Sequence, residues 1–259
     1  MPNPAAAPHG RPLTARSVLL SLLLGNTPPR APVAQLVRTA ALFGIAEGTT
    51  RTALSRMAAA AEVTAADGWY ELSSERLLDR HARQLQSRRA ETRPWDGATW
   101  IQGVVVADGR RPAAERSRLR DDLGRARFAE LREGVWLRPD NLAGSDGLDH
   151  GLTWFVGRPV DHPAALVGRL WDLAGWARRA DDLMAQMDGL REPLAAHDHR
   201  ALADGFVTSA DVLRHFQADP LLPNELLPDD WPGVRLRTDY DTYDATYRAC
   251  LATYFRGDP

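Results

Sequence analysis

The chain has 259 residues, of which 44% are hydrophobic and 25% are charged, and its formal net charge is −2. These values are typical of a globular protein and exclude a collagen-like or wholly disordered chain. The one cysteine, Cys250, excludes an internal disulfide and fits a reducing, cytoplasmic compartment. No apolar run approaches the ~20 residues of a membrane-spanning helix, and no signal-peptide cleavage site follows the Val18–Leu24 run.

The N-terminal part of the chain predicts two short helices. Residues 1–12 are rich in Pro and Ala, and we expect them to be disordered. Thr14 is placed to cap a first helix that ends at Gly25-Asn26. A second helix is expected to begin near Pro32, because four apolar residues recur at helical spacing up to Ala40.

A third helix, over residues 49–60, has two unlike faces. Its apolar stripe includes Ala53, Leu54 and Met57, whereas the opposite face carries short hydroxyl side chains and two arginines. The recognition helix of a helix-turn-helix needs this division, because one side packs on the domain and the other enters the major groove. The residues expected to bind DNA are Thr49, Thr50, Arg51, Thr52, Ser55 and Arg56, with Arg30, which precedes the second helix.

Residues 62–65 and 69–72 predict two strands of a hairpin with Asp67-Gly68 in its turn. Three helices followed by a hairpin predict a winged helix-turn-helix domain over residues 13–73. Residues 1–93 carry a net charge of +5 and the remainder −7, which fits one DNA-binding domain on an acidic body. The hairpin itself holds three acids and no arginine, so we expect more of the phosphate binding from Arg16, Arg30 and Arg38.

Beyond the hairpin, residues 74–93 predict a polar connector helix with Ser73 or Ser74 as its cap. Residues 94–177 then alternate between apolar runs and amphipathic stretches, which predicts a central α+β domain of ferredoxin-like type. Its strands are expected over 99–106, 128–131, 134–137 and 152–157, and its helices over 112–123 and 163–176.

Residues 178–259 predict a helical C-terminal domain, interrupted by a Pro-rich loop over 219–233. Ser209 is expected to cap a helix that contains Leu213 and Phe216. The final helix carries an aromatic stripe, which packs against the other helices in one interpretation and lines a ligand pocket in the other: Tyr240, Tyr243, Tyr247 and Tyr254.

Other chemistries have weaker signals. His197-Asp198-His199 could hold a metal, but histidines so close together in a polar loop are more often solvated, and we expect neither a metal nor a cofactor. The arginines of residues 110–127 could hold the phosphates of a coenzyme A group, or form an exposed, ion-paired face. No Gly-rich phosphate loop or serine nucleophile motif is present, and we expect no enzyme activity.

Separated motifs along nearly the whole chain resemble the phenylacetic-acid-degradation repressors, the PaaX-like transcriptional regulators. The resemblance implies a dimeric, winged-helix repressor of an aromatic-acid catabolic operon, released from DNA by a small aryl acid or its coenzyme A thioester, as with phenylacetyl-CoA in the best-known members. Its motifs are 21–25 with Pro29-Arg30, 43–45, 51–57, Trp95-Asp96-Gly97, 134–139, 219–223, 226–228 and Trp231-Pro232-Gly233.

The resulting hypothesis is a homodimer that places two recognition helices in successive major grooves, about 34 Å apart or a multiple of it. An effector would favour a dimer that no longer matches this spacing. The residues suggested for the effector site are Trp136, Trp154, Trp171, Trp176 and Tyr243.

Two alternatives stay open. The acidic hairpin is compatible with a winged helix that binds proteins rather than DNA. The ferredoxin-like domain is also similar to those of CRISPR-associated nucleases, for which Asp96 is the acid in the corresponding place.

Overall fold

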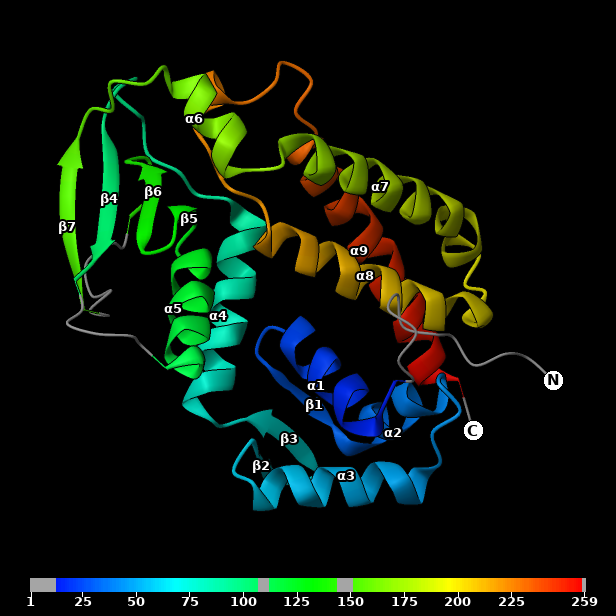
Figure 1. The fold of residues 1–259 in the computed structure, drawn as a ribbon. Coiled ribbons are helices and arrows are strands. Elements are labelled where there is room, and N and C mark those ends of the chain that lie inside the picture. Colours follow the sequence, from blue (N-terminus) through cyan, green and yellow to red (C-terminus); the bar gives the residue numbers. More distant parts are fainter. Residues whose placement is uncertain (1–12, 107–111, 144–150, 258–259) are drawn as a thin grey trace. The chain divides into compact units, whose positions relative to one another are not determined.

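The computed structural model describes residues 13–106, 112–143 and 151–257, which form a mixed α+β protein with two small antiparallel sheets and a helical C-terminal region (Figure 1). The segment expected to be disordered, 1–12, lies outside the described residues. The chain divides into two compact units. The first comprises Met1–Arg88, Ala180–Phe216 and Val234–Pro259, and the second Arg89–Arg179 and Gln217–Gly233. The division into domains 13–73, 74–93, 94–177 and 178–259 stays a prediction.

The first unit begins with three short helices around an apolar core. The Thr14 hydroxyl accepts from the backbone N–H of Ser17 and the Ser17 hydroxyl from that of Thr14, so the predicted cap is confirmed as a capping box. Gly44, at a φ of +70°, lies in the turn between the second and third helices. Leu19, Leu23, Leu36, Leu54 and Met57 are at most 1% exposed. The helices are α1 (Ala15–Gly25), α2 (Val33–Ala41) and α3 (Glu47–Ala59).

The predicted hairpin is present, and a third strand joins it. Asp67 and Gly68 both have positive φ, as a tight two-residue turn requires. Sequence reasoning did not predict the third strand, residues 30–32. It pairs antiparallel with the second strand of the hairpin, with Arg30 opposite Glu71. The sheet therefore has the order β1-β3-β2 and is built from β1 (Arg30–Pro32), β2 (Val63–Ala66) and β3 (Trp69–Leu72).

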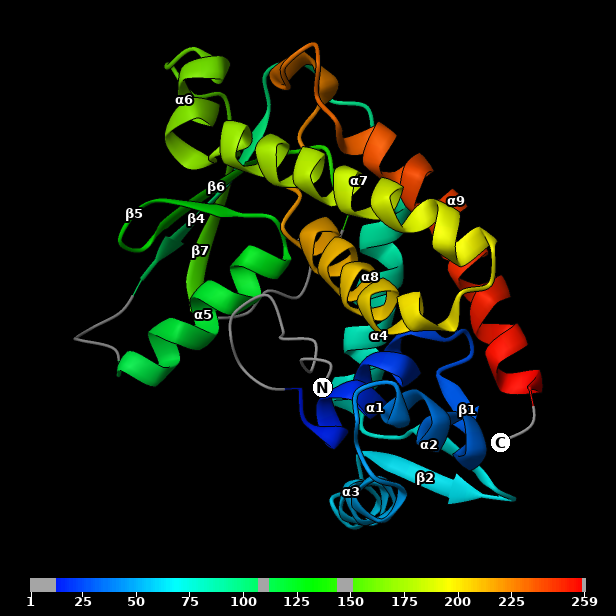
Figure 2. The same cartoon turned by 90° about the vertical axis from the view of Figure 1, so that its right-hand side faces the viewer.

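The predicted connector, α4 (Glu75–Arg89; Figure 2), belongs to the first unit up to Arg88, and Leu77, His81, Gln84 and Ser87 form its buried side. The last carbonyl groups of a helix have no partner within it. At the end of α1, Gln84 donates to the Leu24 carbonyl oxygen at 3.0 Å and His81 to that of Asn26 at 2.8 Å. Arg248 donates to the Gly25 carbonyl oxygen at 2.8 Å. Side chains from α4 and from the C-terminal helix thus complete the end of α1.

The C-terminal region is helical, as predicted, but two details of the prediction are wrong. The expected cap Ser209 lies inside a helix that begins seven residues earlier, at Leu202. The helix expected over 163–176 is broken, because Trp171 is extended and Asp172 accepts from the backbone N–H of Gly175 at 2.8 Å to start a new helix. The elements are α6 (Pro163–Leu170), α7 (Leu173–Ala195), α8 (Leu202–Gln217) and α9 (Gly233–Arg256), with short 3₁₀ turns at His199–Ala201 and Asn224–Leu226.

The second unit is built on a four-stranded antiparallel sheet of order β5-β6-β4-β7. Successive residues of a strand point to opposite faces, and Trp100 and Ile101 accordingly enter two different clusters. Ile101 packs with residues of α5, and Trp100 packs with α6 and the Pro-rich loop. The elements are β4 (Trp100–Val105), α5 (Ala113–Arg125), β5 (Ala129–Arg132), β6 (Val135–Pro139) and β7 (Leu152–Gly157).

The order β4-α5-β5-β6-β7 agrees with the predicted βαββ unit and its further strand. A ferredoxin-like unit has a second helix before its last strand. The described residues between β6 and β7 form no helix, and α6 follows β7 instead. The ferredoxin-like classification stays a prediction.

Candidate nucleic-acid interface

Helix α3 has one buried and one exposed face, as its sequence predicts. Leu54 and Met57 face the core formed with α1 and α2. Thr49, Arg51, Thr52, Ser55 and Arg56 are exposed, and we call these five residues the α3 face. The expectation that Thr50 faces DNA is wrong, because its side chain is 0% exposed and its hydroxyl donates to the Ala46 carbonyl oxygen at 3.2 Å. Thr50 stabilises the start of the helix and is not available to a base.

The hydroxyl groups of the α3 face are bonded back onto the helix. Thr52 donates to the carbonyl oxygen of Gly48 at 2.8 Å, and Ser55 to that of Arg51 at 3.1 Å. Such bonds use the hydroxyl proton and leave the oxygen lone pairs outward. The two side chains therefore present acceptors, and they become donors when they rotate away from the helix.

The two arginines of the α3 face differ in their partners. Arg51 donates to Glu47 one turn earlier at 2.7 Å, and both side chains are 58% exposed. An exposed pair of this kind contributes only about 0–1 kcal/mol, so a phosphate can displace it. Arg56 has no ion pair within the described residues. Arg56 is therefore the arginine of this face whose charge is most available to an anion.

A groove of about 920 Å³ runs beside the α3 face, between α3 and the start of α1. Thr49, Thr52 and Arg56 line it on one side, and Arg16 and Glu62 on the other. Arg16 is bound to Glu62 by two hydrogen bonds, one of them 3.0 Å long from Nε. The Arg16 guanidinium lowers the pKa of Glu62, which stays ionised. Arg16 is therefore paired in this structure, and its expected contact with phosphate stays a prediction.

Arg30 and Arg38 have different positions. Arg30 is exposed on β1 and lies 5.3 Å from the centroid of the Trp69 ring, beside the hairpin. It brings a positive charge to a hairpin that has none of its own. Arg38 instead donates to the carbonyl oxygens of Phe255 at 3.1 Å and Gly257 at 2.7 Å. Arg38 closes the end of α9, which corrects its expected role in phosphate binding.

Within the second unit, the structure does not bring the four suggested effector tryptophans into one site. Tyr243 belongs to the first unit, where its hydroxyl donates to the Gly205 carbonyl oxygen at 2.9 Å. The tryptophans belong to the second unit, where Trp136 and Trp154 share one cluster and Trp171 belongs to another. Trp136 packs with α5, Trp154 lies 5.1 Å from Phe128, and Trp176 stacks on Trp231 at 4.4 Å.

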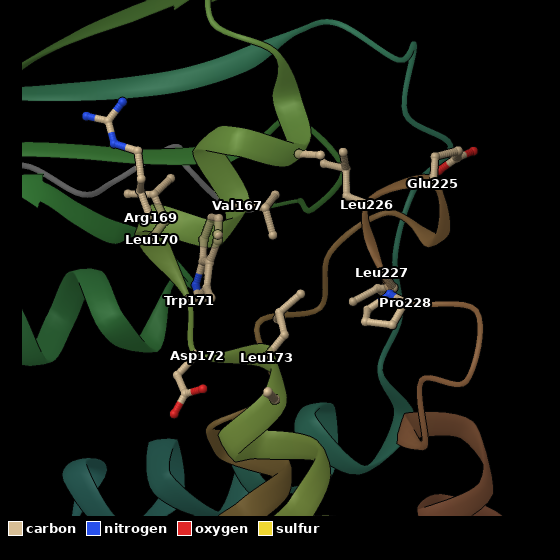
Figure 3. A pocket seen from close by; sticks show the side chains of 13 residues that line it. Val167, Arg169, Leu170, Trp171, Asp172, Leu173, Glu225, Leu226, Leu227 and Pro228 are labelled. Carbon is tan, nitrogen blue, oxygen red and sulfur yellow. The ribbon is translucent and has the colours of Figure 1, made fainter.

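Trp171 lines a pocket of about 700 Å³ where the α6–α7 break meets the Pro-rich loop. Figure 3 shows Val167 and Leu173 facing Leu226 and Leu227 across this pocket. Its polar lining residues, Arg169, Asp172 and Glu225, are all exposed. The lining thus provides an apolar surface but no buried polar group that would orient a ligand.

The other suggested sites have structural explanations or lie partly outside the described residues. Asp96 accepts from the backbone N–H groups of Ala98 at 2.9 Å and Thr99 at 2.7 Å, and from the Thr99 hydroxyl, which together lower its pKa to about 2. Asp96 shapes the loop before β4. In the arginine-rich segment, Arg120 pairs with Glu130 and Arg125 with Asp122, whereas residues 110–111 are outside the described chain.

No group of metal-ligating side chains occurs within the described residues, His197-Asp198-His199 included. Asp198 instead pairs with Arg200 at 2.9 Å, and His199 contacts the Thr253 hydroxyl at 3.1 Å. None of the described helices is both long and apolar enough to cross a membrane.

Comparisons with known proteins agree with this arrangement of elements. The sequence profile of the PaaX-like protein family matches residues 14–76, and that of the PaaX-like protein C-terminal domain matches residues 171–257. Among solved structures, the chain is similar to the uncharacterized protein Rv0674 from Mycobacterium tuberculosis, with 38% sequence identity and a TM-score of 0.73. That match covers 93% of this chain and 98% of the other. No curated protein matches the chain.

Proposed function

Because the chain belongs to the PaaX-like protein family, a family of transcriptional regulators, we propose that it binds double-stranded DNA and regulates transcription. The observation that carries the proposal is the α3 face, an exposed surface of hydroxyls and arginines on a helix whose other side is packed on α1 and α2. Such a helix can enter a major groove while its domain stays intact.

In this proposal α3 is the recognition helix of a winged helix-turn-helix, and β2 and β3 form the wing. Arg56, Arg51 and Thr49 contact bases and phosphates, and Thr52 and Ser55 supply shorter polar contacts. Arg30 stands in for the arginines that the hairpin lacks. The two protomers of a homodimer bind half-sites about 34 Å apart, or a multiple of it. Sedimentation at micromolar concentration tests the dimer, and a monomer with unchanged DNA affinity would contradict it.

The wider role that we propose is repression of an aromatic-acid catabolic operon, relieved by an aryl acid or an acyl-CoA such as phenylacetyl-CoA. The family resemblance supports this role. The aromatic residues suggested for the effector do not add support, because the four tryptophans are divided between the two faces of the sheet and the Trp176–Trp231 stack. The proposal has no catalytic step, and Asp96, the acid suggested for a nuclease, is occupied by the loop that it shapes.

Fluorescence anisotropy with a labelled duplex from the region upstream of the protein's own gene tests the proposal. We expect specific binding that weakens steeply with salt. Arg56→Ala should lower the affinity about tenfold and reduce the salt slope by about one. Arg235→Ala removes another exposed positive charge, on α9, so it is the control for net charge and should leave the affinity unchanged.

A protein-binding module is the second candidate, and the hairpin favours it. Asp67 and Glu71 are exposed there, and they would repel phosphates. In this case the protein would not bind the duplex even at low salt, and Arg56→Ala and Arg235→Ala would behave alike. Specific duplex binding that depends on Arg56 would exclude this candidate.

A further inference from the structure

The first unit contains a partly enclosed pocket of about 100 Å³ where residues of α1 and α4 meet residues of α8 and α9. Its walls are largely apolar, with Leu22, Leu85, Phe206, Leu213 and Leu251 among the lining residues. A dry cavity of about 150 Å³ is enough to bind benzene in another protein. A smaller pocket that is open on one side can take one ring, with part of it outside.

Two hydroxyl groups in the lining of this pocket, those of Ser209 and Tyr247, are buried without a hydrogen-bond partner among the described residues. Tyr247 is 6% exposed, and its hydroxyl oxygen is buried without a hydrogen bond to any described residue. Buried polar groups are nearly always hydrogen-bonded, so a lone hydroxyl requires an explanation. Burial raises the pKa of Tyr247, so the hydroxyl keeps its proton and can donate.

The neighbouring tyrosine on α9 shows the contrast. Tyr243 lies one helical turn earlier, and its ring stacks on that of Tyr247 with the centroids 6.4 Å apart. Its hydroxyl already donates to the Gly205 carbonyl oxygen at 2.9 Å, and its side chain is not among those that line the pocket. Of this stacked pair, only the Tyr247 hydroxyl is available to an occupant of the pocket.

The charged residues in the lining are satisfied by the protein. Asp244 accepts from Arg88 and from Arg248, each at 3.0 Å. Arg88 also binds Asp241 at 2.7 Å, and Arg248 binds the Gly25 carbonyl oxygen at 2.8 Å. A charged ligand would have to displace one of these partners. The unmet requirements of the pocket are thus neutral hydrogen bonds, those of the Tyr247 and Ser209 hydroxyls.

We propose that this pocket binds a compact, uncharged, mainly apolar molecule about one ring in size, with one acceptor atom on the Tyr247 hydroxyl. Where the inference concerns regulation, it rests on the proposed function. The occupant would touch residues of α1, and α1 packs directly on α3. A ligand that binds better to one arrangement of these helices can shift the DNA affinity of the α3 face. The shift is at most the difference between the ligand's binding free energies for the two arrangements.

Phenol and toluene form a matched pair of probes, because they have nearly the same shape and only phenol carries a hydroxyl. Calorimetric titration of the full chain should show phenol binding about fivefold more tightly than toluene, the value of one net hydrogen bond. In Tyr247→Phe the preference for phenol should be lost, because phenol then buries its hydroxyl without this partner. In Tyr243→Phe, which removes the hydroxyl that is already bonded, the fivefold preference should persist.

If phenol does not bind at saturating concentration, or if Tyr247→Phe leaves the preference for phenol intact, the proposal is overturned. The pocket is then a site for water alone. Circular dichroism establishes that each variant is folded. Ala210→Leu, which adds bulk to the lining without touching Tyr247, should abolish the binding of both probes. If it leaves phenol binding unchanged, the ligand is bound elsewhere and the assignment fails.

The DNA titration is then repeated with saturating phenol. A change in affinity in the wild type that disappears in Tyr247→Phe supports regulation through this pocket, and an unchanged affinity overturns it. If the protein binds phenol as described but never binds DNA, the ligand site stands and the proposed function fails.

Discussion

The Arg38 guanidinium lies 4.7 Å from the centroid of the Tyr254 ring, and the Tyr254 hydroxyl donates to the Arg38 backbone carbonyl oxygen at 3.1 Å. The same guanidinium binds the carbonyl oxygens of Phe255 and Gly257, which are at the end of α9. A cation is favourable at the C-terminal end of a helix, where carbonyl groups have no helical partners. This contact joins α2 to α9 within the first unit.

Arg38→Ala should therefore destabilise the protein, even though Arg38 is not part of the apolar core. Hydrogen bonds from a charged donor contribute about 1.5–3 kcal/mol, and partial exposure reduces this, so we expect a loss of about 2 kcal/mol. Denaturant unfolding measures it. Tyr254→Phe, which removes one neutral hydrogen bond, should cost about 1 kcal/mol. A larger loss for Tyr254→Phe than for Arg38→Ala would contradict this account.

Glu47→Gln should strengthen DNA binding if the α3 face is the interface. The substitution releases Arg51 from its ion pair and removes a negative charge that faces the phosphates. We expect an affinity gain of about threefold to tenfold at low salt, which shrinks as salt rises. The measurement is anisotropy at several salt concentrations. In the background of Arg51→Ala the gain should be smaller, and an equal gain there would show that Arg51 is not involved.

Asp172→Ala should cost about 1 kcal/mol of stability, because Asp172 caps the first turn of α7 through the backbone N–H of Gly175. Asp172→Asn should recover most of the loss, since an amide oxygen can accept the same hydrogen bond. Asp181, exposed further along α7, provides the control, and Asp181→Ala should have little effect. Urea unfolding of the three variants distinguishes a cap from a general charge effect.

The loop before β4 should lose stability in acid. The pKa of Asp96 is lowered from 3.8 to about 2 in the folded protein. A depressed carboxyl pKa adds stability that is complete above the unfolded value and is lost as the pH falls through the folded one. The difference in unfolding free energy between wild type and Asp96→Asn should thus shrink from pH 5 to about pH 2. A difference that is constant over this range would show that the charge of Asp96 has no role.

Local patterns in the sequence predicted much of this fold. Helical periodicity placed α2 and α3, the capping residue Thr14 placed α1, and Asp67-Gly68 placed the hairpin turn. These features depend on neighbours a few residues apart, which a sequence displays directly. The exposed residues of the α3 face followed from the same periodicity. Thr50 was expected to be exposed with them, but it lies on the buried side of the helix.

What the sequence did not reveal depends on distant partners. Strand β1 has three residues and exists because β3 has a free side to pair with. At the break, the Trp171 ring packs against the distant Trp100, and no Gly or Pro occupies position 171 or 172 to mark it in the sequence. Arg16 and Arg38 looked like free charges because their partners are 46 or more residues away in the chain.

The discontinuous path of the first unit has a consequence for biosynthesis. Its helices α1 and α2 leave the ribosome early, but the side chains that close α1 and α2 onto α9 belong to residues near 248 and 254. Contacts this far apart in sequence form late and slow folding. Until then α1 and α2 lack the hydrogen bonds from α9 that stabilise them. A chain that stops before α9 should therefore be a target for proteases and chaperones rather than a competing DNA-binding protein.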